Sequence, residues 1–443
     1  MRQLTITVDS GKQESDFREC EISYFRTTYS LSPMVVPMRI SRSVPLVFAR
    51  NLLVMGCSVW LAACNSSSSS SSGSGSSSGS SSSTSTIVVE SFTTDSTTEL
   101  ASFGIAGPMD VNPGCVPDAA SNTPLPEGLL VYRRDEQLTR LVVFAHGNGH
   151  FVRGSWLPHM RRELQLAQFY QNNPGSVAFV ATDYRDNLGF PALRGAHDTI
   201  AATLRALKKF PTIDTVYLFG VSMGAAVSGT AIAESVVLPT GESRFTADGS
   251  PLFDYWIDVE GVSQLSETYA EAAVAAQISE FAAAARDGIE RDTGGTPPEC
   301  PLAYYRRSPA YHAATMKLGG IRAATVIHAV NDGLVPHNQG RVMAAALTTA
   351  SIPTQFFTIV GVFPGQDPGT TGTETLQAGD LDLVLNLAGH GSEAQAFHPV
   401  MRVAFENLRK MLDGTYNETV PYFECLVDPN LPPESCQVDS FQP

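Results

Sequence analysis

The sequence has no excess of positive charge. It contains 29 lysine and arginine residues against 44 aspartate and glutamate residues, which gives a net charge of −15 at pH 7. Nucleic acids and anionic lipid surfaces attract proteins through clustered basic side chains, so this balance argues against both as electrostatic partners. The acidic balance does not by itself identify a substrate.

The N-terminal part also lacks an uninterrupted apolar run long enough to span a membrane. Its most apolar segment, residues 38–64, carries three arginines and two short apolar stretches, which is typical of a secretory signal peptide. The alternative is a buried apolar helix that ends at Cys64 by chance, and the serine tract that follows argues against it. The arginines are Arg39, Arg42 and Arg50, and the apolar stretches are Leu52–Met55 and Val59–Ala63.

The end of this segment, Leu61-Ala62-Ala63-Cys64, resembles a bacterial lipobox. The resemblance implies that Cys64 is lipidated, that the signal is cleaved before it, and that the protein is anchored to a membrane of the cell envelope. Asn65 differs from the aspartate that often retains lipoproteins at the inner membrane, which favours the outer membrane, with the protein facing the periplasm or the cell surface. Residues 1–37 are interpreted as an over-extended start.

Residues 65–86 are predicted to form a flexible linker. From Ser66 to Thr86 the chain contains only serine, glycine and threonine, so it cannot bury enough apolar surface to fold. Its root-mean-square reach is about 25 Å. Cleavage before Cys64 leaves 22 basic and 39 acidic residues and a net charge of −17, so the mature chain stays acidic.

Cysteines are few, and they lack the spacing of a metal site. There is no C-x-x-C pair and no histidine at ligand spacing, so we predict no metal. Export to an oxidising compartment favours disulfides, and four cysteines allow three pairings. Because Cys425 and Cys436 close a short loop, we favour that pair, which leaves Cys115–Cys300. Reduced, buried thiols are the alternative for Cys115 and Cys300.

Residues 87–443 are predicted to form one α/β domain. No internal repeat is present, and short β-branched or aromatic runs alternate with longer amphipathic ones, which indicates a mostly parallel sheet with helices on both faces. The expected strands are Leu129–Tyr132, Leu141–Ala145, Val177–Asp183, Thr215–Phe219, Tyr255–Val259, Ala324–Ala329 and Thr354–Val360, and the expected helices are Trp156–Gln171, His197–Lys209, Ala225–Glu234, Asn338–Thr349 and Ala396–Leu412.

An alanine-rich run interrupts this alternation. Residues 265–289 have apolar side chains at helical spacing and follow the strand expected at 255–259. The run could be a helix that covers the core. Its position after a strand end favours a second interpretation, in which residues 262–320 form a helical cap over an active site.

The most informative motif is Gly220-Val221-Ser222-Met223-Gly224. It lies between the apolar run 215–219 and the small residues 225–229, which predicts a strand, a sharp turn and a helix. This is the arrangement of a nucleophile elbow, in which glycines two residues before and after the serine avoid collisions. The alternative is a glycine-rich turn with a serine that has no function.

A nucleophilic serine needs a base and a carboxylate that orients this base. His390 is the favoured base because glycines flank it and it follows the last expected strand; His398, His328 and His337 are weaker candidates. Asp332 is the favoured acid because its Asn-Asp-Gly turn follows the strand 324–329. The alternative acids at the end of the preceding strand are Asp258 and Glu260.

The order Ser222, Asp332, His390 resembles that of the α/β-hydrolase superfamily, over residues 129–412. The run L-V-V-F-A-H-G-N-G at 141–149 is similar to the oxyanion loop of that superfamily. The resemblance implies that the backbone N–H groups of Asn148 and Met223 bind the oxyanion, while His146 braces the loop.

Two short segments narrow the resemblance. Thr182-Asp183-Tyr184-Arg185 and Ser308-Pro309-Ala310 are similar to parts of the prolyl oligopeptidase and dienelactone hydrolase branches. Two features argue against the prolyl oligopeptidase branch. No propeller domain precedes the hydrolase domain, and Ala225 follows Gly224 where those peptidases usually have a second glycine. The three-glycine oxyanion loop of hormone-sensitive-lipase relatives is also absent.

The expected activity is hydrolysis of small-molecule or lipid carboxylic esters through an acyl-serine, without a cofactor. A peptidase or amidase with the same triad is one alternative, and a membrane-tethered binding protein without activity is another. Which acyl group is preferred is expected to depend on residues 262–320 and on the Gly/Thr-rich loop 364–377.

Overall fold

The computed structural model describes the parts of the chain that carry most of the predicted elements. The described residues belong to one unit, residues 80–443. The predicted start, signal peptide, lipobox cysteine, linker and loop 364–377 lie outside them. The described ranges are residues 87–95, 115, 125–134, 136–161, 176–185, 189–236, 251–360, 389–391, 398–428 and 436–437.

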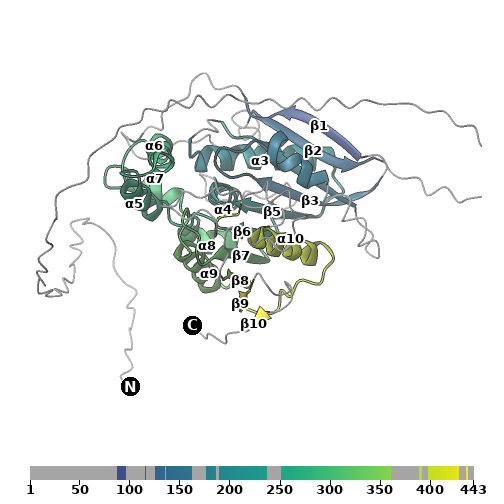
Figure 1. Cartoon of the computed structure of the whole chain (residues 1–443). Helices are drawn as coiled ribbons and strands as arrows, with labels where there is room; N and C mark the ends of the chain where they lie inside the picture. The colour runs from purple at the N-terminus through teal and green to yellow at the C-terminus, as the bar shows by residue number, and fades with distance from the viewer. Residues whose placement is uncertain are drawn as a thin grey trace, which may run out of the picture. The chain divides into compact units, whose positions relative to one another are not determined.

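One sheet of ten strands runs through the described residues. The strands are β1 (Ile87–Thr93), β2 (Glu127–Arg133), β3 (Leu138–Ala145), β4 (Ser176–Thr182), β5 (Thr215–Val221), β6 (Tyr255–Val259), β7 (Ala323–Ala329), β8 (Thr354–Ile359), β9 (Tyr422–Val427) and β10 (Cys436–Gln437). Their order across the sheet is β1-β2-β4-β3-β5-β6-β7-β8-β9-β10 (Figure 1). Neighbours from β4 to β9 are parallel, whereas β1, β2 and β10 join the sheet in antiparallel pairs.

Helices cover both faces of this sheet, as predicted. The helical segments are η1 (Val152–Trp156), α3 (Ala192–Lys209), α4 (Met223–Glu234), α5 (Leu265–Ala275), α6 (Glu280–Thr293), α7 (Pro301–Arg306), η2 (Pro309–His312), α8 (Ala313–Leu318), α9 (Asn338–Thr349) and α10 (Pro399–Leu412). Side chains of η1 and α10 pack on one face, and those of α3, α4, α8 and α9 pack on the other. Because both faces are covered, the central strands are mostly apolar and buried rather than alternating between buried and exposed side chains.

An aromatic cluster fixes α10 and η1 on their face of the sheet. The ring of Phe144 in β3 stacks on Trp156 of η1 at 4.3 Å between centroids, and Phe219 in β5 stacks on Phe405 of α10 at 5.2 Å. These four side chains are almost completely buried. Large buried aromatic rings contribute strongly to stability, so this cluster holds the central strands that precede the candidate site.

The seven predicted strands are all present, but three strands were missed. β1 and β10 are edge strands, and β9 follows α10, so the strand at 354–359 is not the last one, contrary to prediction. Two predicted helices are described only in part: of 156–171 the structure describes Trp156–Arg161, and of 396–412 it describes residues 398–412. α3 begins five residues earlier than predicted, directly after Pro191.

The alanine-rich run forms two helices instead of one. α5 ends at Ala275 and α6 begins at Glu280, because Ser279 caps α6 by accepting a hydrogen bond from the Ala282 N–H at 3.3 Å. In the described part of the chain, no helix is both long enough and apolar enough to span a bilayer.

One predicted disulfide is present. Cys115 and Cys300 are bonded, with Cα atoms 5.7 Å apart, which ties residue 115 to the start of α7. Cys425 is also disulfide-bonded, and β9, which carries it, pairs with β10. The side chain of Cys436 is outside the described residues, so the Cys425–Cys436 pair stays a prediction.

Candidate active site

Ser222 occupies a strained turn between β5 and α4. Its φ of 56° and ψ of −123° are unfavourable for a residue with a side chain, and such strain concentrates at functional sites. The flanking glycines explain why the turn can form. A Cβ atom at Gly224 would lie 2.1 Å from the Ala145 carbonyl oxygen, and one at Gly220 would lie 2.5 Å from the Gly224 carbonyl oxygen. The motif therefore forms the sharp turn that its spacing predicts.

His390 and Asp332 form a direct pair. The imidazole Nδ1 of His390 donates to the Asp332 Oδ2 atom at 2.7 Å. Asp332 follows β7, and its Oδ1 atom accepts the backbone N–H groups of Leu334 and Val335 at 2.8 and 2.9 Å. The carboxylate is therefore fixed by its own loop, and it leaves the other imidazole nitrogen of His390 for chemistry.

A second imidazole contacts the same carboxylate. His328 in β7 is fully buried, and its Nε2 donates to the Val335 carbonyl at 2.7 Å while lying 3.4 Å from Asp332 Oδ2. Burial acts to raise the pKa of Asp332, but the imidazoles of His390 and His328 outweigh it and hold this pKa below its usual range. Asp332 is thus a stable negative charge, and His328 supports the acid rather than lining the pocket.

Ser222, His390 and Asn148 line one pocket of about 170 Å³. The α6 residues Phe281 and Ala285 are among the residues that line it. The segment between β6 and β7 therefore borders the pocket, as expected for a cap. Asn148 is one of the two predicted oxyanion donors. The other is Met223, which begins α4 directly after Ser222 and has a buried side chain. The lining residues are Gly147, Asn148, His150, Ser222, Phe281, Ala285, Leu334, His390 and Gly391.

His146 braces the loop that carries Asn148. Its buried ring stacks on Tyr184 at 4.0 Å between centroids, and its Nδ1 donates to the Gly147 carbonyl at 2.9 Å. Burial lowers the pKa of His146 to about 3, so the imidazole is neutral. Asp183 extends this brace, because its carboxylate accepts the Val152 N–H at 2.8 Å.

The remaining sequence candidates divide into two groups. His398 is buried at the start of α10, where its Nδ1 accepts the Val400 N–H at 3.4 Å, and His337 lies beside Thr358 on β8. Neither of these histidines lines the pocket. Of the alternative acids, Asp258 stays within β6, but Glu260 reaches the candidate base: its Oε2 lies 3.6 Å from His390 Nδ1.

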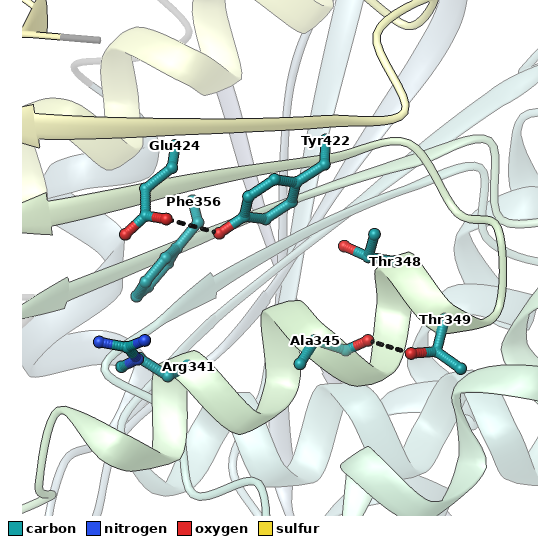
Figure 2. Close-up of a pocket in the computed structure, with 7 residues that line it drawn as sticks. All are labelled: Arg341, Ala345, Thr348, Thr349, Phe356, Tyr422 and Glu424. Atoms are coloured by element: carbon teal, nitrogen blue, oxygen red, sulfur yellow. Dashed lines mark hydrogen bonds between the residues drawn. The ribbon is translucent and has the colours of Figure 1, made fainter. Parts of the chain in front are cut away.

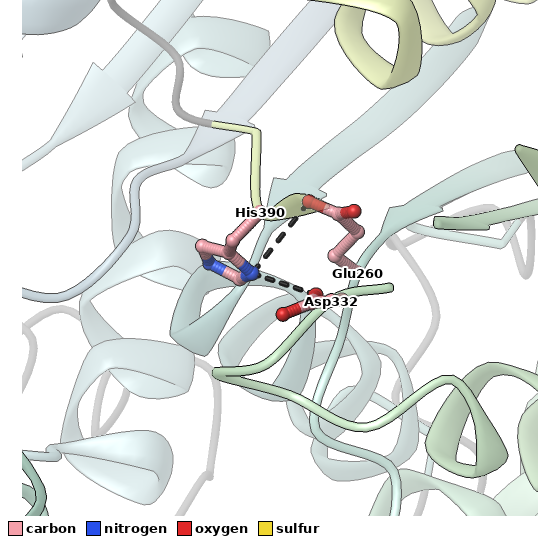
Figure 3. Close-up of side chains that lie close together, drawn as sticks. All are labelled: Glu260, Asp332 and His390. Carbon is pink, nitrogen blue, oxygen red and sulfur yellow. Dashed lines mark hydrogen bonds and ion pairs between the residues drawn. The ribbon is translucent and has the colours of Figure 1, made fainter. Parts of the chain in front are cut away.

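Glu260, Asp332 and His390 form the one cluster among the described residues with the composition of a metal site (Figure 3). Their ligand atoms lie within 4.8 Å of one another. These atoms already have protein partners, however. Both Asp332 oxygens accept hydrogen bonds, and the oxygens of Glu260 accept the Gly391 and Ala329 N–H groups at 2.5 and 3.3 Å. We therefore interpret the cluster as a hydrogen-bonded acid–base group.

A larger pocket of about 410 Å³ lies between α9 and the strands β8 and β9 (Figure 2). In it, the Tyr422 hydroxyl donates to the Glu424 carboxylate at 3.0 Å. This pocket contains no histidine or cysteine and none of the predicted site residues, so its size alone does not make it a candidate for catalysis. It is lined by Arg341, Ala345, Thr348, Thr349, Phe356, Tyr422 and Glu424.

The strand order, the serine turn after β5 and the acid loop after β7 are those of the α/β-hydrolase fold. No protein-family model matches the sequence. A search of curated proteins gives no significant match either.

Several solved structures resemble the chain at low identity. An acylaminoacyl peptidase from Pyrococcus horikoshii is 14% identical over 53% of this chain and 34% of its own, with a TM-score of 0.35. A puromycin-hydrolyzing peptidase from Mycobacterium tuberculosis is 16% identical over 69% and 41%, with a TM-score of 0.40. An esterase from Pyrobaculum calidifontis is 16% identical over 72% and 91%, with a TM-score of 0.44.

The chain thus spans only 34% and 41% of the lengths of the two peptidases.

The buried carboxyl group of Asp258 leads to a pH prediction. Burial raises the pKa of Asp258 to about 7, and its Oδ1 has no hydrogen-bond partner in the described part of the chain. Because the folded pKa exceeds the usual value of 3.8, the stability that this group contributes is present at low pH and is lost as pH rises towards 7. The side chain of Asp258→Asn cannot ionise. The melting temperature of this variant should therefore rise relative to that of the wild type as the pH increases from 5 to 8.

Thermal denaturation across this pH range checks the prediction. Asp287→Asn, which alters a carboxylate that is 62% exposed, is the control and should change much less with pH. A constant difference between Asp258→Asn and the wild type at all pH values would contradict the prediction.

Proposed function

We propose that this protein is a serine hydrolase that cleaves carboxylic esters through an acyl-serine intermediate. The observation that carries the proposal is that Ser222 and His390 line the same pocket, while His390 Nδ1 donates a hydrogen bond to Asp332 Oδ2 at 2.7 Å. Acyl transfer requires a nucleophile and a base that share one pocket, and a carboxylate that orients the base.

In the proposed mechanism, the Ser222 hydroxyl attacks the ester carbonyl while His390 takes its proton through Nε2. Asp332 stabilises the imidazolium and holds the proton on Nδ1. The backbone N–H groups of Asn148 and Met223 bind the oxyanion, and Met223 is suited to this because it begins α4, where N–H groups favour negative charge. His390 then protonates the leaving alcohol, and a water that it activates releases the acid.

The pocket next to Ser222, with a volume of about 170 Å³ and Phe281 and Ala285 of α6 in its lining, would hold the acyl group of the ester. A peptidase or amidase would use the same triad, so the substrate profile must distinguish the two reactions. Relative rates on short-chain p-nitrophenyl esters and on chromogenic amides provide this comparison.

Replacing the nucleophile tests the proposal. Ser222→Ala removes the attacking oxygen, so the variant should fold but lose ester hydrolysis by about 10⁶-fold and take no fluorophosphonate label. Hydrolysis of p-nitrophenyl esters and labelling of the purified protein measure both effects.

Ser266→Ala, which changes a partly exposed serine of α5, is the matched control and should retain full activity and labelling. Labelling retained by Ser222→Ala would contradict the proposal. A wild type without any ester or amide turnover would favour the alternative of a binding protein without activity.

The α6 side chains lead to a prediction about acyl size. Phe281→Ala enlarges the pocket next to Ser222, so the preference for a longer over a shorter acyl chain should rise roughly tenfold. The ratio of kcat/KM values across ester chain lengths measures the change. Val274→Ala is the control, because Val274 is exposed on α5 and does not line the pocket. An unchanged ratio in Phe281→Ala would exclude α6 as a determinant of acyl size.

We further propose that the protein is exported and anchored by a lipid on Cys64, with the hydrolase carried by the 65–86 linker. The support for this proposal is the sequence of residues 38–86. When the full chain is expressed in a Gram-negative host with labelled palmitate, the wild-type protein should carry the label and be recovered in the membrane fraction. Cys64→Ser should lose the label, and Cys57→Ser should keep it. Label retained by Cys64→Ser would refute the anchor.

A further inference from the structure

The carboxyl group of Glu260 lies next to the candidate base and has no role in the proposed mechanism. Glu260 directly follows β6, has a φ of 51° and is completely buried. Its backbone N–H donates to the Ile327 carbonyl of β7 at 2.8 Å. A buried glutamate in a left-handed conformation is costly, so its surroundings must compensate for the strain and for the loss of solvent.

Two backbone N–H groups from different segments satisfy the Glu260 side chain. Oε2 accepts the Gly391 N–H at 2.5 Å, and Oε1 accepts the Ala329 N–H at 3.3 Å. Gly391 is the residue after His390, and Ala329 ends β7 just before the acid loop. The side chain therefore connects the backbone beside the candidate base to the strand that carries the candidate acid.

The same carboxyl group faces the imidazole. Glu260 Oε2 lies 3.6 Å from His390 Nδ1, the atom that donates to Asp332 Oδ2 at 2.7 Å (Figure 3). Two carboxyl groups from the ends of β6 and β7 thus approach one nitrogen. Only Asp332 is close enough to accept its proton.

We propose that Glu260 is a second positioning residue of the active site, which fixes the His390 loop through the Gly391 N–H and backs the imidazole beside Asp332. The inference rests on the proposed function, because it takes His390 to be the base.

The charges in the cluster are consistent with this role. Burial and the charge of Asp332 raise the pKa of Glu260 above neutral, whereas the pKa of Asp332 is lowered. The negative charge of the cluster is therefore concentrated on Asp332. The groups that face Glu260 are Asp332 and His328 from β7 and its loop, and His390 from its own loop.

The test compares Glu260→Ala and Glu260→Gln with the wild type in p-nitrophenyl ester hydrolysis. Glu260→Ala frees the Gly391 N–H, and a small displacement of a catalytic group can lower the rate on the order of 100-fold. We expect kcat to fall 10- to 100-fold in this variant. KM should stay near the wild-type value, because Glu260 does not line the pocket. Glu260→Gln keeps one oxygen that can accept the Gly391 N–H, so it should recover most of kcat.

The pH profile distinguishes this role from a merely structural one. Ionised Glu260 would add negative charge beside His390 and favour the imidazolium, which raises the pKa of the base. The kcat/KM profile of the wild type should therefore show an extra ionisation above neutral pH. Glu260→Gln cannot ionise, so its profile should lack this step even where its kcat resembles that of the wild type.

Asp258→Asn is the matched control. It removes a buried carboxyl group in β6, two residues before Glu260, and it should keep the wild-type kcat and pH profile. The inference is overturned if Asp258→Asn reproduces the loss seen in Glu260→Ala, or if both Glu260 variants keep wild-type kcat and pH profile. If Glu260→Ala does not fold, Glu260→Gln alone decides, since an unchanged pH profile would overturn the inference.

The Ser222→Ala variant distinguishes a failure of the proposed Glu260 role from a failure of the proposed function. If Ser222→Ala is inactive while the Glu260 variants behave as wild type, only the role of Glu260 is wrong. If Ser222→Ala remains active, the proposed function itself is wrong.

Discussion

The arrangement of the site depends on backbone hydrogen bonds that continue the parallel sheet beyond its strand ends. The Ser222 N–H donates to the Val259 carbonyl at 2.8 Å, and the Glu260 N–H donates to the Ile327 carbonyl at the same distance. These bonds fix the residues after β5 and β6 against the neighbouring strand. Because the strands are parallel, the ends that carry Ser222, Glu260 and the Asp332 loop meet at one edge of the sheet.

The second constraint is electrostatic. Glu260, Asp332 and His328 are buried, and His390 is nearly so, which makes an unpaired charge among them costly. The cluster limits this cost by concentrating the negative charge on Asp332, which two imidazoles and two backbone N–H groups stabilise. The carboxyl group of Glu260, whose pKa is raised, can then serve as a hydrogen-bond acceptor for the backbone next to His390. The geometry and the protonation states of the site therefore depend on each other.

Much of this fold could be predicted from local patterns. The strands at 215–219 and 255–259 are short apolar runs, and the turn at Ser222 has the glycine spacing that its backbone requires. The edge strand β1 was missed because its partly exposed side chains give no continuous apolar run. The division between α5 and α6 was missed because it depends on one capping serine, Ser279, within an alanine-rich segment.

The sequence by itself determined the α/β architecture and the order of the candidate site residues, because apolar periodicity and glycine spacing act through neighbouring residues. It did not decide which acid orients His390, since Asp258, Glu260 and Asp332 all lie at or near the ends of neighbouring strands. Only the tertiary structure placed Asp332 at 2.7 Å and Glu260 at 3.6 Å from His390 Nδ1 and left Asp258 out of the pocket lining. Those distances depend on contacts between loops 58 to 131 residues apart in the chain, which no local pattern encodes.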